Sequence, residues 1–262
     1  MLTATSRTFV RFISKSQKPL HVTKCPPPNY DTGCTYCNPT TEMESTMKTD
    51  PSTIRNTAPP LRKLVLYRSN NKNNDHWAKK VEVYDPMRKM SQYGRGNGNM
   101  ISMTSLSPKD NSKADTEFTF YVYPDCQNVT LPNNDENNFK KLWDTLNRDD
   151  YNNLSESGFP TVPETKIIAI VCGHTQRDIR CGVVGKMVHD ELEKVIAHEN
   201  LSDQVDLGYV SHVGGHVYAG NLIILKPNGL MAFYGMVRPH HIQGIVEKTI
   251  KDNEIIDELS RY

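Results

Sequence analysis

Residues 166–198 read KIIAIVCGHTQRDIRCGVVGKMVHDELEKVIAH, and this stretch decides the fold of the C-terminal part of the chain. Residues 166–171 are a short run rich in β-branched side chains, which is typical of a buried strand. A loop between Cys172 and Cys181 follows. From 183 to 198 apolar residues recur at helical spacing, as Val184, Met187, Val188, Leu192, Val195 and Ile196. The stretch therefore predicts a strand, a short loop and an amphipathic helix.

The pattern downstream completes a domain. It predicts strands at 206–211, 219–226 and 230–235 and a terminal helix at 241–259. The last two strands are joined through Asn228-Gly229, a pair that favours a hairpin turn. The order of strands and helices predicts class α/β (α+β) for residues 165–262.

Upstream, residues 21–136 are expected to form an N-terminal domain. Its leading segment, up to Pro60, is rich in proline and contains three cysteines, so we expect it to be extended. Strands are predicted at 63–67, 80–84 and 117–123, and residues 137–164 are predicted to be a helix (137–154) and a linker (155–164). One interpretation of this half is a degenerate copy of the C-terminal domain, although the similarity is too faint to establish a repeat.

The N-terminus has the features of a mitochondrial presequence. No acidic residue occurs in positions 1–30, and Arg7, Arg11, Lys15 and Lys18 fall on one side of a helical projection. A basic, amphipathic leader without a continuous apolar core is typical of mitochondrial import and not of secretion. We therefore predict a presequence over residues 1–20 and a mitochondrial location, in the matrix, the intermembrane space or both. A basic tail without an address is the alternative.

The composition argues against several classes of protein. The 31 basic and 30 acidic residues give a net charge of +1, which disfavours a nucleic-acid-binding protein. No apolar run approaches the ~18 residues of a membrane-spanning helix. Six cysteines in 262 residues do not make a disulfide scaffold, so they are better interpreted as ligands or redox groups.

Two cysteines and two histidines form the candidate site. Cys172, Cys181, His212 and His216 lie on two predicted loops of the C-terminal domain. A helix that begins just after Cys181 would stabilise a thiolate there. Two glycines between the histidines would allow a tight turn, so that both imidazoles could approach one metal centre.

Three interpretations of this group are open from the residues alone. The first is two core cysteines and two unrelated histidines. The second is a structural zinc site, although eight residues separate Cys172 from Cys181 and zinc ligand pairs usually have about two to four between them. The third is a [2Fe–2S] cluster with two cysteines on one iron and two histidines on the other.

At these residues the chain resembles the thioredoxin-like ferredoxins of the sucrase/ferredoxin-like family. The resemblance rests on Cys172-Gly173-His174, Arg177-Asp178, Arg180-Cys181-Gly182, His212-Val213-Gly214-Gly215-His216 and Ala219-Gly220-Asn221. It is specific over residues 165–240 and loose over 21–135. It implies a thioredoxin-like ferredoxin domain at 165–262, preceded by a degenerate domain of thioredoxin-like type. It also implies a [2Fe–2S] cluster whose ligands are Cys172, Cys181, His212 and His216.

Other polar residues have supporting or separate roles. We expect His174 to have a supporting or a surface role rather than to be a ligand. Among Arg177, Asp178 and Arg180 of the same loop we expect an ion pair that braces the loop and a cation that faces the cluster, and ordinary solvated charge is the alternative. Cys34 and Cys37 form a C-x-x-C pair, which is a candidate redox dithiol or half of a zinc site. The alternative is a reducible disulfide, or free thiols, without a catalytic task. Because the pair lies in a proline-rich segment and not on a strand-to-helix turn, a thioredoxin-type active site is not expected.

Two function classes follow. The first is electron transfer by a redox protein that is not a conventional enzyme, and neutral imidazole ligands would raise the reduction potential of its cluster. The second is thiol exchange, in which Cys172, Cys181 or the Cys34/Cys37 pair would react with imported mitochondrial proteins that carry thiols. Both classes require redox partner proteins, whereas neither a nucleic-acid partner nor a membrane span is expected.

Overall fold

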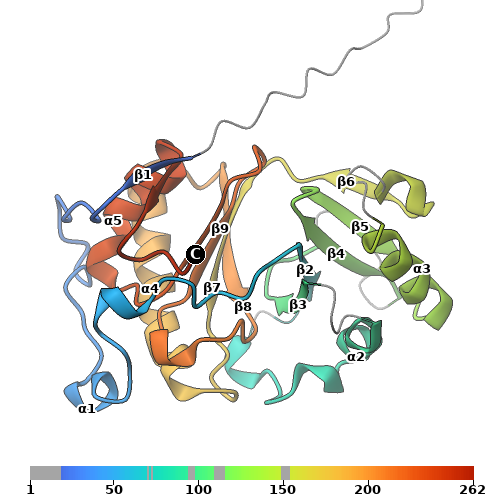
Figure 1. Ribbon diagram of the computed structural model, residues 1–262, viewed down its shortest axis with the longest axis horizontal. Coiled ribbons are helices and arrows are strands. Elements are labelled where there is room, and N and C mark those ends of the chain that lie inside the picture. The colour runs from blue at the N-terminus through green and yellow to red at the C-terminus, as the bar shows by residue number, and fades with distance from the viewer. Residues whose placement is uncertain (1–18, 70, 72, 94–97, 109–115, 149–153) are drawn as a thin grey trace, which may run out of the picture.

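A nine-stranded mixed sheet runs through the molecule in the order β10-β9-β7-β8-β3-β2-β4-β5-β6 (Figure 1). The computed structural model describes residues 19–262 except 70, 72, 94–97, 109–115 and 149–153. The strands of the sheet are β2 (Lys63–Arg68), β3 (Asn99–Thr104), β4 (Phe118–Tyr123), β5 (Gln127–Leu131), β6 (Thr161–Pro163), β7 (Ile167–Cys172), β8 (Val205–Val210), β9 (Leu222–Leu225) and β10 (Met231–Tyr234). The α-helices are α1 (Thr41–Glu44), α2 (Asp85–Tyr93), α3 (Glu136–Leu146), α4 (Ile179–His198) and α5 (Ile242–Ile245).

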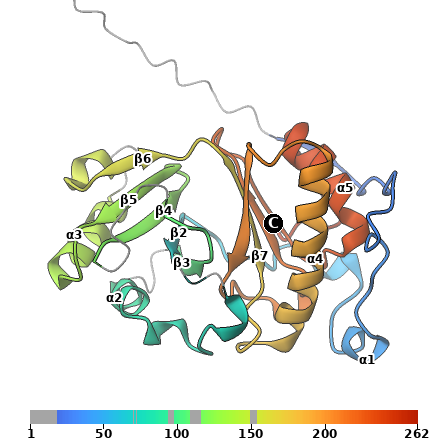
Figure 2. The same cartoon turned by 180° about the vertical axis from the view of Figure 1, so that it is seen from behind.

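The C-terminal half has the predicted architecture. Strands β7 and β8 are parallel and are joined by α4, β9 is antiparallel to β7, and β10 is antiparallel to β9. Helix α5 follows the β9–β10 hairpin, and α4 crosses one face of β7 and β8 (Figure 2). A βαβ unit followed by a hairpin and a helix is the order of a thioredoxin-like domain. The α/β (α+β) class is therefore confirmed.

The N-terminal half repeats this order. Strands β2 and β3 are parallel and α2 lies between them in sequence, β4 is antiparallel to β2, β5 is antiparallel to β4, and α3 follows. The strand order β3-β2-β4-β5 thus has the same directions as β8-β7-β9-β10. The structure shows a duplicated topology that the sequence could not establish.

The two halves meet at their corresponding strands. Thr104 at the end of β3 pairs with Val210 at the end of β8 in an antiparallel bridge. The next residues, Ser105 and Ser211, make reciprocal bonds: Ser211 N donates to Met103 O at 2.7 Å, and Ser105 N donates to Tyr209 O at 3.0 Å. One sheet is therefore continuous across both halves. The domain boundary at residue 165 stays a prediction.

Strand β7 is buried on both faces, which explains its continuous apolar run. Ala169 belongs to the core beneath α4 and α5. Ile168 and Ile170 belong to a second core that also includes Leu64 of β2, so this second core is shared by the two halves. Cys172 is also part of this shared core. Side chains alternate between the two faces of a strand, so Cys172 lies on the same face as Ile168 and Ile170, and its sulfur faces away from the core beneath α4 and α5.

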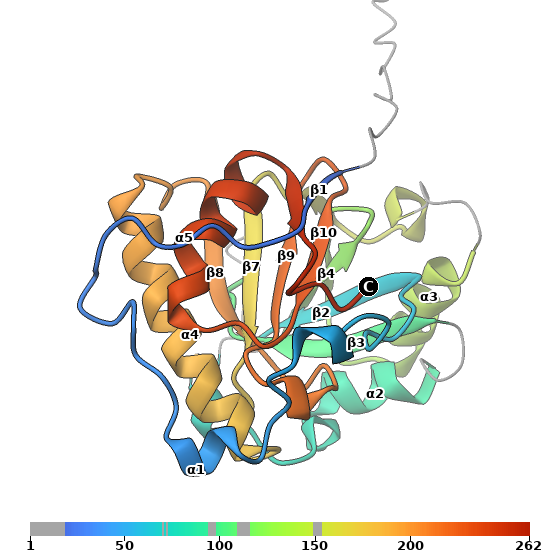
Figure 3. The ribbon, with the colours of Figure 1, turned by 60° about the vertical axis from the view of Figure 1, so that its left-hand side comes forward.

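Terminal segments pack together on the outer side of the C-terminal half. Strand β1 (Leu20–Val22) pairs in parallel with β11 (Glu254–Ile256), and residues 23–44 continue beside α5 and α4 (Figure 3). Tyr30 O accepts a hydrogen bond from the Gln243 side chain at 2.7 Å. The predicted presequence falls almost entirely on residues 1–18, which lie outside the described residues, and β1 begins at Leu20.

Several predicted boundaries were wrong. The strand predicted at 80–84 is a 3-10 helix (Val81–Val83): Val81 and Tyr84, three residues apart, pack against the core around Trp77, whereas Val83 is 67% exposed. The predicted linker 155–164 contains β6, which extends the sheet beyond β5. The helix predicted at 137–154 is α3, whose last residue is Leu146.

The terminal helix predicted at 241–259 is shorter than expected. It begins with α5 and continues as a π-helical turn (Val246–Lys251). It stops there because Asn253 adopts a left-handed backbone conformation, with φ of 61°, and β11 follows. Within the described residues, no helix is long and apolar enough to cross a membrane.

Candidate metal centre

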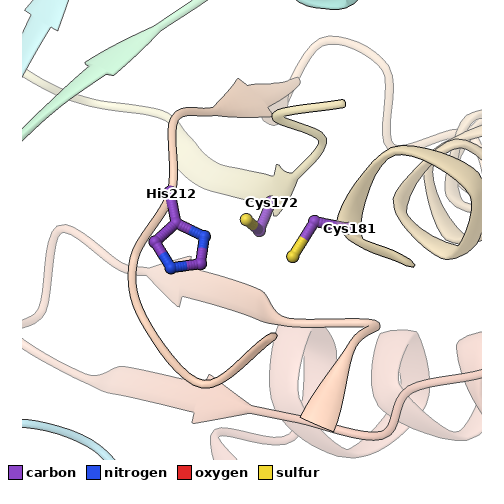
Figure 4. A group of neighbouring side chains, drawn as sticks. All are labelled: Cys172, Cys181 and His212. Carbon is purple, nitrogen blue, oxygen red and sulfur yellow. The ribbon is translucent and has the colours of Figure 1, made fainter. Parts of the chain in front are cut away.

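Three of the four predicted ligands converge at the junction of β7, α4 and β8. Cys172 is the last residue of β7, Cys181 lies in the first turn of α4, and His212 follows β8 by two residues. One ligand atom from each lies within 4.8 Å of the others. Figure 4 shows both sulfurs side by side with the imidazole turned toward them. Both cysteines are buried and His212 is partly buried.

Helix α4 begins one turn earlier than its apolar pattern predicted. Asp178 is the N-cap residue, and its carboxylate accepts a hydrogen bond from Arg180 N at 3.0 Å. Cys181 is therefore inside the first turn, where free backbone N–H groups and the helix dipole favour a thiolate. Gly185 brings the helix close to β7, because a Cβ atom at this position would overlap the Cys172 carbonyl oxygen.

The two thiols of the site differ in how readily they ionise. A hydrogen bond from Cys181, the nearby His212 imidazole and the Val213 N–H hold the pKa of Cys172 well below its usual range, although burial opposes this. The pKa of Cys181 is raised, because Cys181 donates to Cys172 and is itself buried. A thiolate is thus already favoured at Cys172, which is the form that binds metals.

His212 has an unused ligand atom. Its Nδ1 is buried and has no hydrogen-bond partner among the described residues. A buried polar atom without a partner is rare in folded proteins, and a role as a metal ligand accounts for it. The donor set of two sulfurs and one imidazole nitrogen fits a metal ion or an iron–sulfur cluster.

His174 supports His212, as predicted. The backbone N–H of His212 donates to His174 Nδ1 at 3.3 Å, and His174 Nε2 lies 2.9 Å from Ala78 O. Burial lowers the pKa of His174, so its ring is neutral and can accept at Nδ1 while it donates at Nε2. This contact joins the ligand loop to the N-terminal half.

His216 lies beside the group but outside it. Its ring centroid is 5.6 Å from that of His212, and its side chain is 45% exposed. Its Nδ1 is 3.8 Å from the Asp178 carboxylate. Gly214 and Gly215 have φ values of 80° and 70°, so the tight turn between the histidines exists. The structure therefore places the fourth predicted ligand at the outer rim of the site.

The charged loop is braced, and a cavity opens next to it. The Asp178 carboxylate receives two hydrogen bonds from Arg180, at 2.9 and 2.8 Å, which confirms the predicted ion pair. Arg177 lines a cavity of about 480 Å³ that also reaches His174 and His212. The site is thus accessible from solvent on the histidine side and closed on the cysteine side.

Sequence reasoning missed the contribution of the N-terminal half to this site. Asn74 donates to Gly173 O at 2.6 Å, and the Trp77 ring meets His174 edge-on with centroids 5.9 Å apart. These residues lie about a hundred positions upstream, in a polar loop without regular periodicity. No local pattern in the sequence signals that such a loop covers a site in the other half of the chain.

Cys34 and Cys37 do not belong to this group. They occupy a turn in which Cys37 N donates to Cys34 O at 3.0 Å, and Thr35 between them is bound to the buried Glu191 of α4 at 2.8 Å. A hydrogen bond with Cys37, and then burial, raise the pKa of Cys34 to about 11. All six cysteines are free thiols.

Fold and site together define an α+β protein with a cysteine–histidine group suited to a metal. A family model described as sucrase/ferredoxin-like matches residues 54–262. The chain belongs to this family.

Relatives support the same assignment over nearly the whole chain. Altered inheritance of mitochondria protein 32 of Clavispora lusitaniae is 35% identical over 92% of this chain and 94% of its own length. The protein of the same name from Meyerozyma guilliermondii is 29% identical over the same shares. That from Debaryomyces hansenii is 43% identical over 37% of this chain and 35% of its own length. The names of these relatives refer to mitochondria, in line with the location that the leader predicts. No solved structure matches the chain.

Proposed function

We propose that the protein is a mitochondrial thioredoxin-like [2Fe–2S] ferredoxin that acts in electron transfer and thiol redox homeostasis. The observation that carries the proposal is the convergence of Cys172, Cys181 and His212 within 4.8 Å, with an unused buried nitrogen on the histidine. Cys172 and Cys181 would hold one iron, and His212 and His216 the other. When bound, the cluster supplies one-electron chemistry.

The arrangement of the four side chains favours a cluster over a single zinc ion. Three converging ligands also fit a mononuclear site. However, both cysteines are on the buried side, and the second imidazole lies next to the first on the solvent side. A two-iron cluster with separate cysteine and histidine ends matches this polarity. Zinc would instead need His216 to swing inward to the same point as the other three.

The chain's own residues prepare the site for a negatively charged centre. The N-terminus of α4 and the Val213 N–H stabilise thiolates, and the shared core excludes water from the sulfurs. On the other side, the ring of His216 is 45% exposed and lies next to Asp178. A reduction potential that falls as pH rises is expected from imidazole ligands of this kind.

Metal analysis of anaerobically purified full-length protein tests the proposal. We expect red-brown protein with about two iron and two acid-labile sulfide per chain. C172A and C181A should lose most of both, whereas C126A, which removes a buried cysteine outside the site, should retain them. Colourless protein with one stoichiometric zinc would contradict the cluster in favour of a structural site.

The mitochondrial location rests on the leader and on the names of the relatives. Fusion of residues 1–20 to a soluble reporter should direct it into isolated mitochondria. Reversal of Arg7 and Arg11 to Glu should abolish import, because a basic helical face is the signal. Unchanged import of the charge-reversed leader would contradict this.

A second candidate function, thiol exchange, is supported by Cys34 and Cys37. Their side chains are hydrogen-bonded to each other, and the turn that carries them is anchored to a buried carboxylate while Tyr36 between them is 62% exposed. The dithiol would reduce a disulfide of a partner protein and become a Cys34–Cys37 disulfide, leaving two thiols on the partner. Imported mitochondrial proteins with thiols are the partners that this function would require.

A further inference from the structure

The penultimate residue of the chain lies buried against the histidine loop. Arg261 is 1% exposed and donates hydrogen bonds in several directions. Its Nη1 donates to Gly214 O at 3.1 Å and to Asn221 Oδ1 at 2.8 Å, and its Nη2 donates to Thr57 O at 2.6 Å. The guanidinium also stacks over the Phe233 ring, 4.5 Å from its centroid. This is a fixed side chain.

The positive charge of Arg261 has no carboxylate partner in the described part of the chain. The other two buried arginines of the described residues do have one: Arg68 lies 2.5 Å from Glu164, and Arg238 lies 3.7 Å from Glu44. A buried guanidinium without a counter-charge is costly, so a compensating anion is expected nearby. The thiols of Cys172 and Cys181 are close enough to act on it: in their ionised form they oppose the lowering of the Arg261 pKa by burial.

We propose that Arg261 is the positioning residue and the built-in counter-ion of the cysteine–histidine site. The inference rests on the proposed function, since it assigns to Arg261 the control of the same metal centre. It has two separable parts. The hydrogen bonds hold the histidine loop in place, and the charge stabilises the thiolates and the more negative redox state of the centre.

Asn221 connects Arg261 to both loops of the site. Its side-chain amide accepts from Arg261 and donates to Gly215 O at 3.1 Å, while its backbone carbonyl accepts from Cys172 N at 2.9 Å. One residue thus connects Arg261, the turn between the histidines and the first cysteine. Gly215 fits this contact because any Cβ there would overlap the Arg261 guanidinium.

Substitutions of Arg261 in the full-length protein test both parts. R261Q removes the charge, and R261K keeps the charge but cannot reproduce the forked hydrogen bonds. R238Q is the matched control, because Arg238 is also buried and donates to a backbone carbonyl, that of Ala219 at 3.0 Å, but has Glu44 as its partner. The readouts are the reduction potential and the rate at which a chelator removes iron, with thermal unfolding measured alongside.

We expect R261Q to lower the reduction potential by clearly more than R238Q and to release iron several-fold faster. R261K should keep the potential close to that of the wild type while it also releases iron faster. Equal potentials and equal release rates in R261Q and R238Q would overturn the proposal. If R261Q does not fold, R261K is compared with R238K instead. The proposal then requires faster iron release in R261K and not in R238K, and equal release rates would overturn it.

The outcome is distinguishable from failure of the proposed function. If the wild-type protein proves to hold zinc, the cluster is wrong, and the same variants are then compared for cobalt(II) binding through the sulfur-to-cobalt absorption band. A loss of affinity in R261Q that R238Q does not share would retain the role of Arg261 at a mononuclear site. Equal affinities would overturn it there as well.

Discussion

At the scale of single residues, the two histidines of the site are not equivalent. His212 is held from behind by His174 and has its Nδ1 inside the site, whereas His216 stands at the rim beside Asp178. The sequence motif presents them as a symmetrical pair, four positions apart. The difference arises from His174, which contacts His212 and not His216, lies outside the motif and is itself bound to Ala78 O.

Replacing either histidine with cysteine should change the electrochemistry in a defined direction. H212C or H216C adds a thiolate charge, so we expect a lower reduction potential and a weaker dependence of that potential on pH. Spectroelectrochemistry over about three pH units, from roughly pH 6 to 9, measures both the potential and its dependence on pH. H198C, at an exposed histidine on the last turn of α4, is the control. A variant with unchanged potential and spectrum would show that its histidine is not a ligand.

At the scale of elements, the apolar patterns of β7 and α4 were predicted well because their buried faces are local properties of the sequence. The first turn of α4 was missed, since Ile179 is exposed and the turn depends on the Asp178 cap instead of on apolar spacing. Strand β3 (NMISMT) has few β-branched residues and obtains its place from pairing with β2. Elements such as β3, which the periodicity of the sequence does not predict, form because they pair with strands that are distant in sequence.

The close approach of α4 to β7 should be sensitive to one methyl group. G185A places a Cβ against the Cys172 carbonyl, so the helix must move and the two cysteines must separate. We expect a loss of about 1–3 kcal/mol in the free energy of unfolding, as is typical of overpacking, together with weaker metal binding. Urea unfolding and metal titration are the measurements. K186A, on the solvent side of the same turn, should change neither, and normal metal affinity in G185A would contradict the role given to this contact.

The reactivity of the Cys34 thiol should follow its raised pKa. Because the pKa of Cys34 is about 11, alkylation of this thiol should be slow at neutral pH and should accelerate up to that range. C37A should shift the profile of Cys34 to lower pH, since the hydrogen bond with Cys37 is the largest cause of the raised pKa. Peptide-level mass spectrometry follows each thiol.

The same turn separates the two candidate functions. C34S/C37S should leave the visible spectrum intact, because neither thiol reaches the metal site, and should abolish mixed-disulfide trapping of mitochondrial partners if thiol exchange occurs. Loss of the spectrum in the double variant would mean that the ligand assignment is wrong.

At the scale of the whole molecule, the duplicated topology explains why one half alone carries the site. Arg68 ends β2 opposite Thr104, as Cys172 ends β7 opposite Val210, so the two residues occupy corresponding positions. In the N-terminal half this position holds a buried ion pair with Glu164 instead of a thiolate. The sequence hides the correspondence because the equivalent residues differ in kind, and the strand order alone reveals it.

The N-terminal half is nevertheless part of the folding unit. The core around Ile168, Ile170 and Phe233 is completed by Leu64 and Tyr121 of the other half, and His174 is bound to Ala78. Each large apolar side chain that loses such cover forfeits about 1.5–3 kcal/mol, which is large against the typical 5–15 kcal/mol that stabilises a domain. We therefore expect residues 165–262 alone to be unfolded or aggregated and to bind no metal. Circular dichroism and thermal unfolding of this fragment, compared with the full chain, test the point. A cooperative transition in the fragment with metal still bound would show that the predicted boundary at residue 165 separates two independent domains, and that the continuous sheet is a docking arrangement rather than a shared fold.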